Sequence, residues 1–344
     1  MRLRDTSTYG QEMRRVVAGL AVLVITAGCT GDRPQSTPSR VPSSTPSASS
    51  ASPSASTYPS PRQRTRSSPR PTAQSEPSMN AAAAIRDVRR LGSGIGPREA
   101  TSANFFEAAD LVQARFERIG YHVRQTAVRV PAGNSWGTPV KRGTSANIIA
   151  EPRGFDSRKP HVVVGAHLDT VSRAPGAEDN ASGIAVMLEL ARMTAQQPHR
   201  LPVRFIAFGA EEPRGPGDAL HHFGSRQHVA DLSRSELRAV RAMVSLDRVG
   251  VRASFVPVCS ANGSGEPLQR AIRAEARRVD IVTHSCVNRA SDHWSYAKTG
   301  VPAVRLGSIS YAGYHSPGDL PSVVNRDQLD RVGRVVWAWL RSLE

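Results

Sequence analysis

The sequence predicts an α/β fold with three layers, in which helices cover both faces of a largely parallel, mixed central sheet. From residue 160 onwards, short apolar runs alternate along the chain with stretches that have the periodicity of amphipathic helices. The runs are continuously apolar, as strands covered on both faces should be, whereas a half-exposed strand alternates. In such folds, ligands bind beyond the carboxyl ends of the parallel strands.

The individual elements are predicted from local patterns. Strands are predicted where apolar residues alternate or run without a break, and helices where they recur every three or four residues behind a capping residue such as Asn325. The predicted helices span residues 79–90, 103–119, 181–194, 220–229, 266–279 and 326–343. The predicted strands span residues 122–130, 147–150, 162–164, 203–208, 242–246, 255–258, 281–284 and 303–306.

The first 29 residues have the features of an export signal. Four arginines precede an apolar stretch at 16–27, which is too short to span a bilayer comfortably. The stretch ends in Thr-Ala-Gly-Cys, which resembles the lipobox of bacterial lipoproteins and implies lipidation at Cys29. We therefore expect an exported protein that is anchored by lipid to the outer face of the bacterial cell membrane or released from it. An ordinary signal peptide with an incidental cysteine is the alternative.

Residues 30–78 predict a disordered tether. From residue 34 to residue 78 the chain contains 15 Ser and 10 Pro in 45 residues, too few apolar groups to offset the entropy cost of ordering. This leaves residues 79–344 as a single catalytic domain, for which a monomer is the default expectation. That domain carries a net charge of +10, from 35 basic and 25 acidic residues, but its arginines are scattered and aromatic residues make up only 5% of the chain. We expect no nucleic-acid partner.

Two cysteines, Cys259 and Cys286, fall in the predicted domain. In an exported protein an even pair of cysteines usually forms a disulfide, which we expect here. Two buried free thiols are the alternative. Neither cysteine has a partner at the Cys-x-x-Cys spacing of metal sites.

Polar side chains follow the buried strands at the edge where a ligand should bind. His167 and Asp169 end or follow one strand, Glu211 and Glu212 another, and Asp247 a third. Asp179 lies at a helix start, and Tyr314 with His315 follows the last strand. Carboxylates crowded together are costly to ionise, and a cation among them removes that cost.

The donor set fits two metal ions better than one. The candidate donors are His167, Asp179, Glu212, Asp247 and His315. Five donors are too many for one catalytic zinc, which takes three protein ligands and water. They suit two zinc ions if one carboxylate bridges both, and imidazole with carboxylate oxygen suits zinc. The predicted cofactor is therefore two zinc ions per chain, and cobalt or manganese in their place is left open.

Six short motifs, taken in order, resemble the secreted bacterial di-zinc aminopeptidases, family twenty-eight of the metallopeptidases. The resemblance covers residues 160–344 and, more weakly, the two helices before them. The motifs are His-x-Asp at 167–169, Asp-Asn-Ala-Ser-Gly at 179–183, Gly-Ala-Glu-Glu at 209–212, Leu-Asp at 246–247, Ser-Asp-His at 291–293 and Tyr-His at 314–315. The resemblance implies the phosphorylase/hydrolase-like zinc exopeptidase fold. It also implies cleavage of the N-terminal residue from peptides with a free amino terminus.

The resemblance also implies a role for each residue. His167 and Asp247 would hold one zinc, Glu212 and His315 the other, and Asp179 would bridge them. Asp169 would accept from the His167 ring and fix its tautomer. Glu211 would be the general base for a zinc-activated hydroxide, and Tyr314 would donate to the oxyanion.

Other residues are given weaker roles. Asp292 and His293 match a family motif and are expected in the substrate pocket. Arg248 stands at a usually apolar position, where it could reach a substrate carboxylate, or be a surface side chain or one that supports the ligands from outside. His221, His222 and His228 are expected to be solvated helix residues.

Two other functions remain open. Glutaminyl cyclases share the superfamily and a related ligand set, although the Asp-Asn-Ala-Ser-Gly segment is closer to the peptidases. The other is a surface lipoprotein that binds peptide or metal without turnover. We would expect it if a metal ligand or the base were missing, but the sequence contains all of these residues.

Overall fold

The computed structural model describes residues 76–343. The predicted signal peptide, the lipidation site Cys29 and nearly all of the predicted tether lie outside the described residues. The helices are α1 Ala81–Arg89, α2 Ala103–Ile119, α3 Ser182–Gln196, α4 Phe223–Asp231, α5 Arg234–Ala239, α6 Pro267–Arg278, α7 His293–Ala297 and α8 Arg326–Arg341. Within this part of the chain, none of the helices combines the length and apolar character needed to cross a bilayer.

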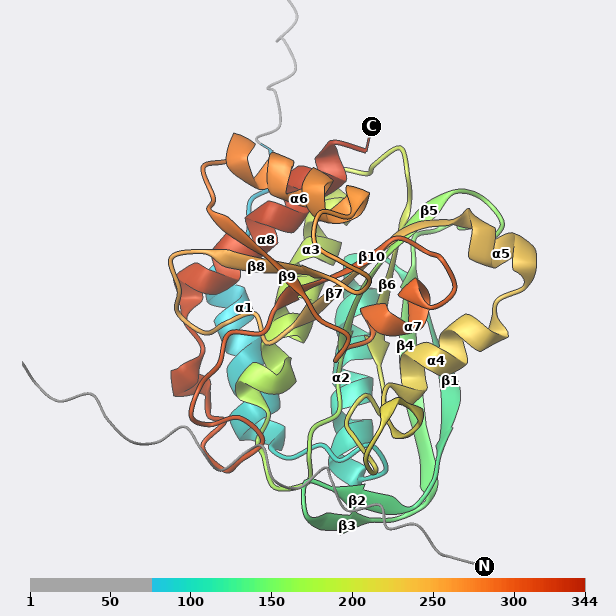
Figure 1. The fold of residues 1–344 in the computed structure, drawn as a ribbon, viewed down its shortest axis with the longest axis vertical. Coiled ribbons are helices and arrows are strands. Elements are labelled where there is room, and N and C mark those ends of the chain that lie inside the picture. Colours follow the sequence, from blue (N-terminus) through green and yellow to red (C-terminus); the bar gives the residue numbers. More distant parts are fainter. Residues whose placement is uncertain (1–75, 344) are drawn as a thin grey trace, which may run out of the picture. The chain divides into compact units, whose positions relative to one another are not determined.

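An eight-stranded sheet forms the middle layer, with the order β1-β4-β6-β5-β7-β10-β8-β9 (Figure 1). Its strands are β1 His122–Val130, β4 Gly143–Glu151, β5 His161–His167, β6 Val203–Phe208, β7 Val240–Asp247, β8 Val256–Ser260, β9 Thr283–Val287 and β10 Ala303–Gly307. The four central strands β6, β5, β7 and β10 are parallel, whereas β1 pairs antiparallel with β4, β4 with β6, and β8 with β10. The predicted largely parallel, mixed sheet is confirmed.

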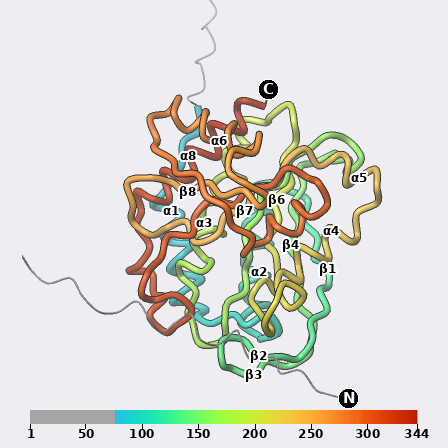
Figure 2. Tube along the Cα trace, in the orientation of Figure 1, coloured from blue at the N-terminus to red at the C-terminus, as the bar shows by residue number. Residues whose placement is uncertain are grey.

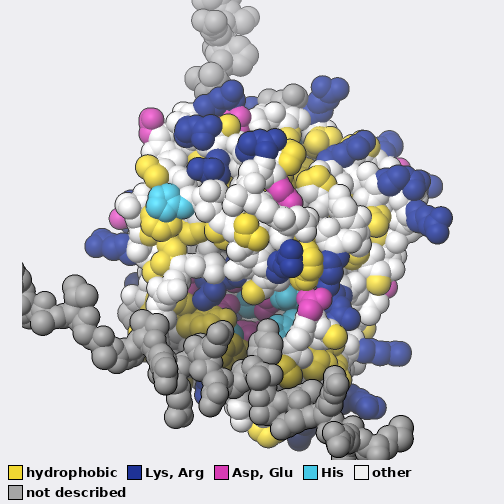
Figure 3. Space-filling model, in the orientation of Figure 1, with side chains coloured by type: hydrophobic (Ala, Val, Ile, Leu, Met, Phe, Trp, Pro, Cys, Tyr) yellow, Lys and Arg dark blue, Asp and Glu magenta, His cyan; other side chains and the backbone are white. Residues whose placement is uncertain are grey.

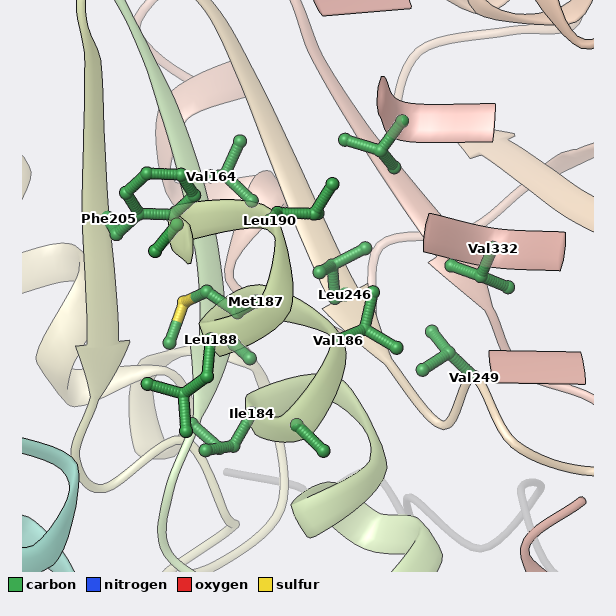
Figure 4. Packing of buried hydrophobic residues seen from close by; sticks show 14 of the residues in the cluster. Val164, Ile184, Val186, Met187, Leu188, Leu190, Phe205, Leu246, Val249 and Val332 are labelled. Carbon is green, nitrogen blue, oxygen red and sulfur yellow. The ribbon is translucent and has the colours of Figure 1, made fainter. Parts of the chain in front are cut away.

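Helices cover both faces of this sheet. On one face α1, α2, α3, α6 and α8 bury the larger apolar cluster, and on the other α4, α5 and α7 cover a smaller one around Val163, Ile206 and Tyr296. Figure 4 shows the larger cluster, in which side chains of α3 such as Met187 and Leu190 pack near Val164 and Phe205 of the sheet. Helix α3 is buried almost throughout, because it lies between the sheet and α8. The predicted three-layer arrangement is therefore confirmed.

The differences from the predicted elements are in short or exposed segments. A separate two-stranded sheet, β2 Gly133–Ser135 and β3 Thr138–Val140, was not predicted, because three-residue strands give no periodic signal (Figure 2). The same holds for α5 and α7, which have six and five residues. Strand β9 begins two residues after the predicted start and reaches Val287, since most of its side chains are exposed and carry no apolar pattern. The remaining short segments are the π-helical turns Arg90–Ile95 and Ala177–Ala181 and the 3₁₀ turns Asp218–Leu220 and Pro321–Val323.

The expected disulfide is present. Cys259 of β8 and Cys286 of β9 are register partners in the parallel pair, which brings their Cα atoms to 4.3 Å. The bond links the edge strand β9 covalently to the only strand with which it pairs in the described sheet.

Candidate functional site

The candidate site lies at the carboxyl ends of the central parallel strands. β5 ends at His167, β7 ends at Asp247, and the turn after β6 carries Glu211 and Glu212. All four side chains are buried. Figure 3 shows acidic and histidine side chains gathered in a hollow on the face in view, with apolar and basic side chains beside it. Parallel strands thus bring residues that are far apart in sequence to one edge, as predicted.

Two groups of three side chains share Asp179. The Asp179 Oδ1 atom lies 3.1 Å from His167 Nε2, which is 3.8 Å from Asp247 Oδ1. The other oxygen, Asp179 Oδ2, lies 3.1 Å from His315 Nε2, which is 3.3 Å from Glu212 Oε2. In each group, the three ligand atoms lie within 4.8 Å of one another. The structure thus brings together all five predicted metal ligands, with one oxygen of Asp179 facing each group.

Buried hydrogen bonds fix the segment that carries Asp179. The Asp319 carboxylate accepts from the backbone N–H groups of Glu178 and Asp179, at 2.8 and 3.1 Å. The Asn180 side chain donates to the Leu246 carbonyl at 2.8 Å, beside the ligand Asp247. The fully buried Arg98 donates to the carbonyls of Pro175 and Gly176, just before this segment, and to three others. Asp179 is therefore held by its own neighbours, independently of any ligand.

The charges in the site shift the pKa values of its titratable groups away from their ordinary values. Burial, opposed by the charge of His315 and assisted by that of Asp179, raises the pKa of Glu212 to about 8. Burial opposes protonation of His315, but Glu212 and Asp179 outweigh it and raise the pKa of this imidazole to about 10. The Glu212 Oε1 atom is buried and has no hydrogen-bond partner among the described residues. Nitrogen and carboxylate donors with an orphaned buried oxygen are what a divalent cation satisfies.

The predicted base, Glu211, lies beside the ligands but belongs to neither group of three. Burial, opposed by the charge of His167 and assisted by the charges of Asp247, Asp169 and Asp179, raises its pKa to about 8. Such a carboxyl group has the raised pKa that general acid–base chemistry near neutral pH requires.

The structure corrects how Asp169 acts. The backbone carbonyl oxygen of Asp169 lies 3.1 Å from His167 Nδ1, whereas its carboxylate oxygen Oδ1 is 3.8 Å away. The carboxylate instead accepts from the backbone N–H groups of Glu211 and Glu212, at 3.0 and 3.1 Å. Asp169 therefore positions the turn that carries the base, while its carbonyl orients the His167 ring.

His222 is a site residue that sequence reasoning missed. Its side chain is only 3% exposed, and its Nε2 atom lies 3.3 Å from Glu211 Oε1. The expectation of solvated helix histidines is wrong for His222 and for the buried His228, whose Nδ1 lies 2.8 Å from the Tyr296 hydroxyl. The predicted helix actually begins at Phe223, so His222 lies in the turn before it and points inward. Half-buried His221 contacts the Gly215 carbonyl and no ligand.

Tyr314, His315 and Arg248 form a stack at the rim of the site. The Tyr314 ring stacks on the ligand His315 with 3.7 Å between ring centroids, and the Arg248 guanidinium lies 4.3 Å from the Tyr314 centroid. Arg248 also donates to the Ser308 hydroxyl at 2.7 Å. Tyr314 is 37% exposed, and burial and nearby carboxylates raise the pKa of its hydroxyl, which keeps it a donor. Arg248 is thus a rim residue, not a surface side chain.

Asp292 and His293 are buried. Asp292 is 0% exposed, and His293 is equally buried with its Nε2 2.8 Å from the Asn288 carbonyl oxygen. Burial and the charge of Glu211 raise the pKa of Asp292 to about 7. The expectation that these two residues belong to the substrate pocket stays a prediction.

Comparison with known sequences links the chain to a peptidase family. The sequence model of Peptidase family M28 matches residues 147–340. Aminopeptidase YwaD of Bacillus subtilis is 32% identical over 206 residues, which are 57% of this chain and 44% of that protein. The protein named probable lipoprotein aminopeptidase LpqL of Mycobacterium tuberculosis is 35% identical over 122 residues, 33% of this chain and 23% of that protein. The chain thus matches less than half the length of both relatives.

Solved structures give the same fold. BSAP, a zinc aminopeptidase from Bacillus subtilis, has a TM-score of 0.69 at 20% identity over 78% of this chain and 95% of that one. A glutaminyl cyclase from Porphyromonas gingivalis has a TM-score of 0.64 at 22% identity over 77% and 99%. At this identity the structures establish the fold and leave the reaction open. The family model covers more than half of the sequence and all five ligands, and the chain belongs to peptidase family M28.

Proposed function

We propose that this chain is a zinc-dependent aminopeptidase, which hydrolyses the first peptide bond of peptides with a free amino terminus. The observation that carries the proposal is the shared Asp179, whose two oxygens face two separate ligand groups beside the unliganded carboxyl group of Glu211. The family and the relatives named aminopeptidase support it. They also favour zinc as the metal.

The donor groups fit two zinc ions. His167, Asp247 and one oxygen of Asp179 would hold the first, and Glu212, His315 and the other oxygen of Asp179 would hold the second. Each group offers one imidazole nitrogen and two carboxylate oxygens, which is a donor set that zinc accepts with one position left for water or substrate. When bound, zinc supplies a Lewis acid for the scissile carbonyl and lowers the pKa of a bound water.

The chain's own residues then move protons and hold charge. Glu211 accepts a proton from the attacking water and passes it to the leaving amine. Its backbone N–H donates to the Asp169 carboxylate, and its Oε1 atom lies 3.3 Å from His222 Nε2, close enough for this imidazole to orient the carboxyl group once a substrate is bound. The Tyr314 hydroxyl donates to the carbonyl oxygen as negative charge develops there. The acidic groups around the site favour a substrate with a positively charged amino terminus.

Export and lipid anchoring at Cys29 are part of the proposal. They are supported by the lipobox-like sequence, and the relative LpqL is named a probable lipoprotein aminopeptidase. Because Cys29 is outside the described residues, the anchor stays a prediction, as does the monomeric state.

An assay on aminoacyl chromogenic amides tests the activity. We expect the full-length, zinc-loaded chain to release the chromophore from free-amine substrates and not from their N-acetylated forms, to lose activity with a chelator and to regain it with zinc. Peptides that begin with glutamine are included and followed by mass. A mass loss from cyclisation, without hydrolysis of other substrates, would replace the peptidase proposal with a glutaminyl cyclase.

Replacing the base should separate chemistry from metal binding. We expect Glu211→Gln to keep the zinc content of the wild type and to lose about 10²- to 10⁴-fold in kcat, because the amide cannot accept the proton. Steady-state kinetics and metal analysis on the same preparation check this. A kcat of the variant equal to that of the wild type would refute the role of Glu211 as the base.

Two substitutions of His222, by Gln and by Asn, test whether its contact with Glu211 affects catalysis. The Gln amide nitrogen can reach about as far as His Nε2, whereas the amide of Asn is one methylene shorter. We expect His222→Gln to keep kcat near the wild type and His222→Asn to lose roughly tenfold to a hundredfold, with KM and zinc content unchanged in both. Equal kcat values in the two variants would show that the contact with Glu211 has no catalytic effect.

Removal of zinc should make stability depend on pH. Glu211, Glu212 and His315 have raised pKa values in the metal-free fold, so between pH 5 and pH 8 the unfolded chain releases protons that the folded chain retains. Stability of the metal-free protein therefore falls as pH rises through this range. We expect zinc to raise Tm more at pH 8 than at pH 6, which calorimetry on both forms can measure. A metal-free Tm that increases from pH 6 to pH 8 would refute the charge assignment.

A further inference from the structure

The tip of the β2–β3 hairpin has an unusual residue for its backbone conformation. Trp136 and Gly137 connect the two strands with φ values of 49° and 87°. Two-residue turns with both φ values positive favour Asn-Gly, and a bulky residue in this region is rare. The Asn134 side chain accepts from the Gly137 N–H at 2.7 Å and supports the turn. Residues held in such strained conformations cluster at functional sites.

The base of the hairpin is held by the loop that carries the catalytic carboxyl groups. Arg214, two residues after Glu212, is buried and donates to the carbonyls of Pro131 and Lys141, at 2.9 and 2.6 Å. It also forms an ion pair with Glu99, and its own carbonyl accepts from the Asn134 N–H at 3.0 Å. One buried guanidinium thus joins both ends of the hairpin to this loop. The tip is held in a fixed place relative to the ligands.

The Trp136 ring stands against the candidate metal site. Its centroid lies 4.5 Å from that of the ligand His315 and 5.8 Å from that of Tyr314, edge to face in both cases. The Trp136 side chain is nevertheless 47% exposed, and Tyr314 beside it is also half-exposed. The two partly exposed rings form an apolar wall next to the place where the scissile bond would lie.

We propose that Trp136 is a specificity-determining residue, which selects peptides whose N-terminal residue carries a large apolar side chain. This inference rests on the proposed aminopeptidase function. Charge at the wall supports it, because the Arg248 guanidinium, 4.3 Å from the Tyr314 centroid, repels a cationic side chain. An apolar side chain avoids this repulsion and buries surface against both rings.

Two substitutions at position 136 test the inference. Trp136→Asn removes the ring but suits the turn, so the fold and zinc content should be kept, whereas Trp136→Phe keeps a smaller ring. We expect the full-length wild type to prefer phenylalanyl and leucyl amides over alanyl and lysyl amides. In Trp136→Asn the ratio of kcat/KM for the phenylalanyl to the alanyl substrate should fall roughly tenfold or more, with a smaller fall in Trp136→Phe. An equal loss for all substrates, or a wild type that prefers alanyl or lysyl amides, would overturn the proposal.

Binding of the free amino acids separates this inference from the proposed function. Calorimetry on the zinc-loaded protein should show L-phenylalanine bound more tightly than L-alanine, and the difference should shrink in Trp136→Asn. If this difference in binding is found while no amide is cleaved, the role of Trp136 in selecting the side chain is supported and the aminopeptidase function is refuted. If amides are cleaved but the two amino acids bind alike in wild type and variant, the role of Trp136 is refuted.

Discussion

The structure depends on the burial of like-charged groups at one edge of the sheet. Asp179, Glu211, Glu212 and Asp247 are all buried there with two histidines. Buried carboxylates that repel one another are costly to ionise, and the raised pKa values of the two glutamates express that cost. Bound cations would offset that cost and would give the unpartnered Glu212 oxygen a partner.

The surrounding fold holds this cluster together without any ligand. Arg98, Asp319 and Asn180 fix the segment of Asp179 through buried hydrogen bonds to the backbone. On the far side, the buried Arg305 of β10 donates to Asp247 Oδ1 at 2.8 Å, and its charge keeps the pKa of that carboxyl group low. Most of these contacts reach backbone groups next to a ligand, which is how outer residues orient the inner ones. The site is thus preorganised by the chain, and the ions complete its charge balance.

The sequence predicted the parts of the molecule that follow from local pattern. Continuous apolar runs predicted the central strands, and the residues after them, with Asp179 at a helix start, predicted the clustering of the five candidate ligands with Glu211, because parallel strands end at one edge. Contacts between distant turns could not be predicted. His222, Arg305 and Trp136 reach the site from a helix-preceding turn, a buried strand and a short hairpin, and their spacing carries no signal. Asp292 shows the converse, since a motif match does not reveal that its side chain is sealed in the interior.

The central proposal is that Asp179 would hold two metal ions, one at each carboxylate oxygen. The most direct measurement is anomalous diffraction at the zinc edge from crystals of the zinc-loaded protein. We predict two peaks, one between Asp179, His167 and Asp247 and the other between Asp179, Glu212 and His315. A single peak, or two peaks of which one lacks Asp179 as a neighbour, would contradict the shared-carboxylate site from which the mechanism is derived.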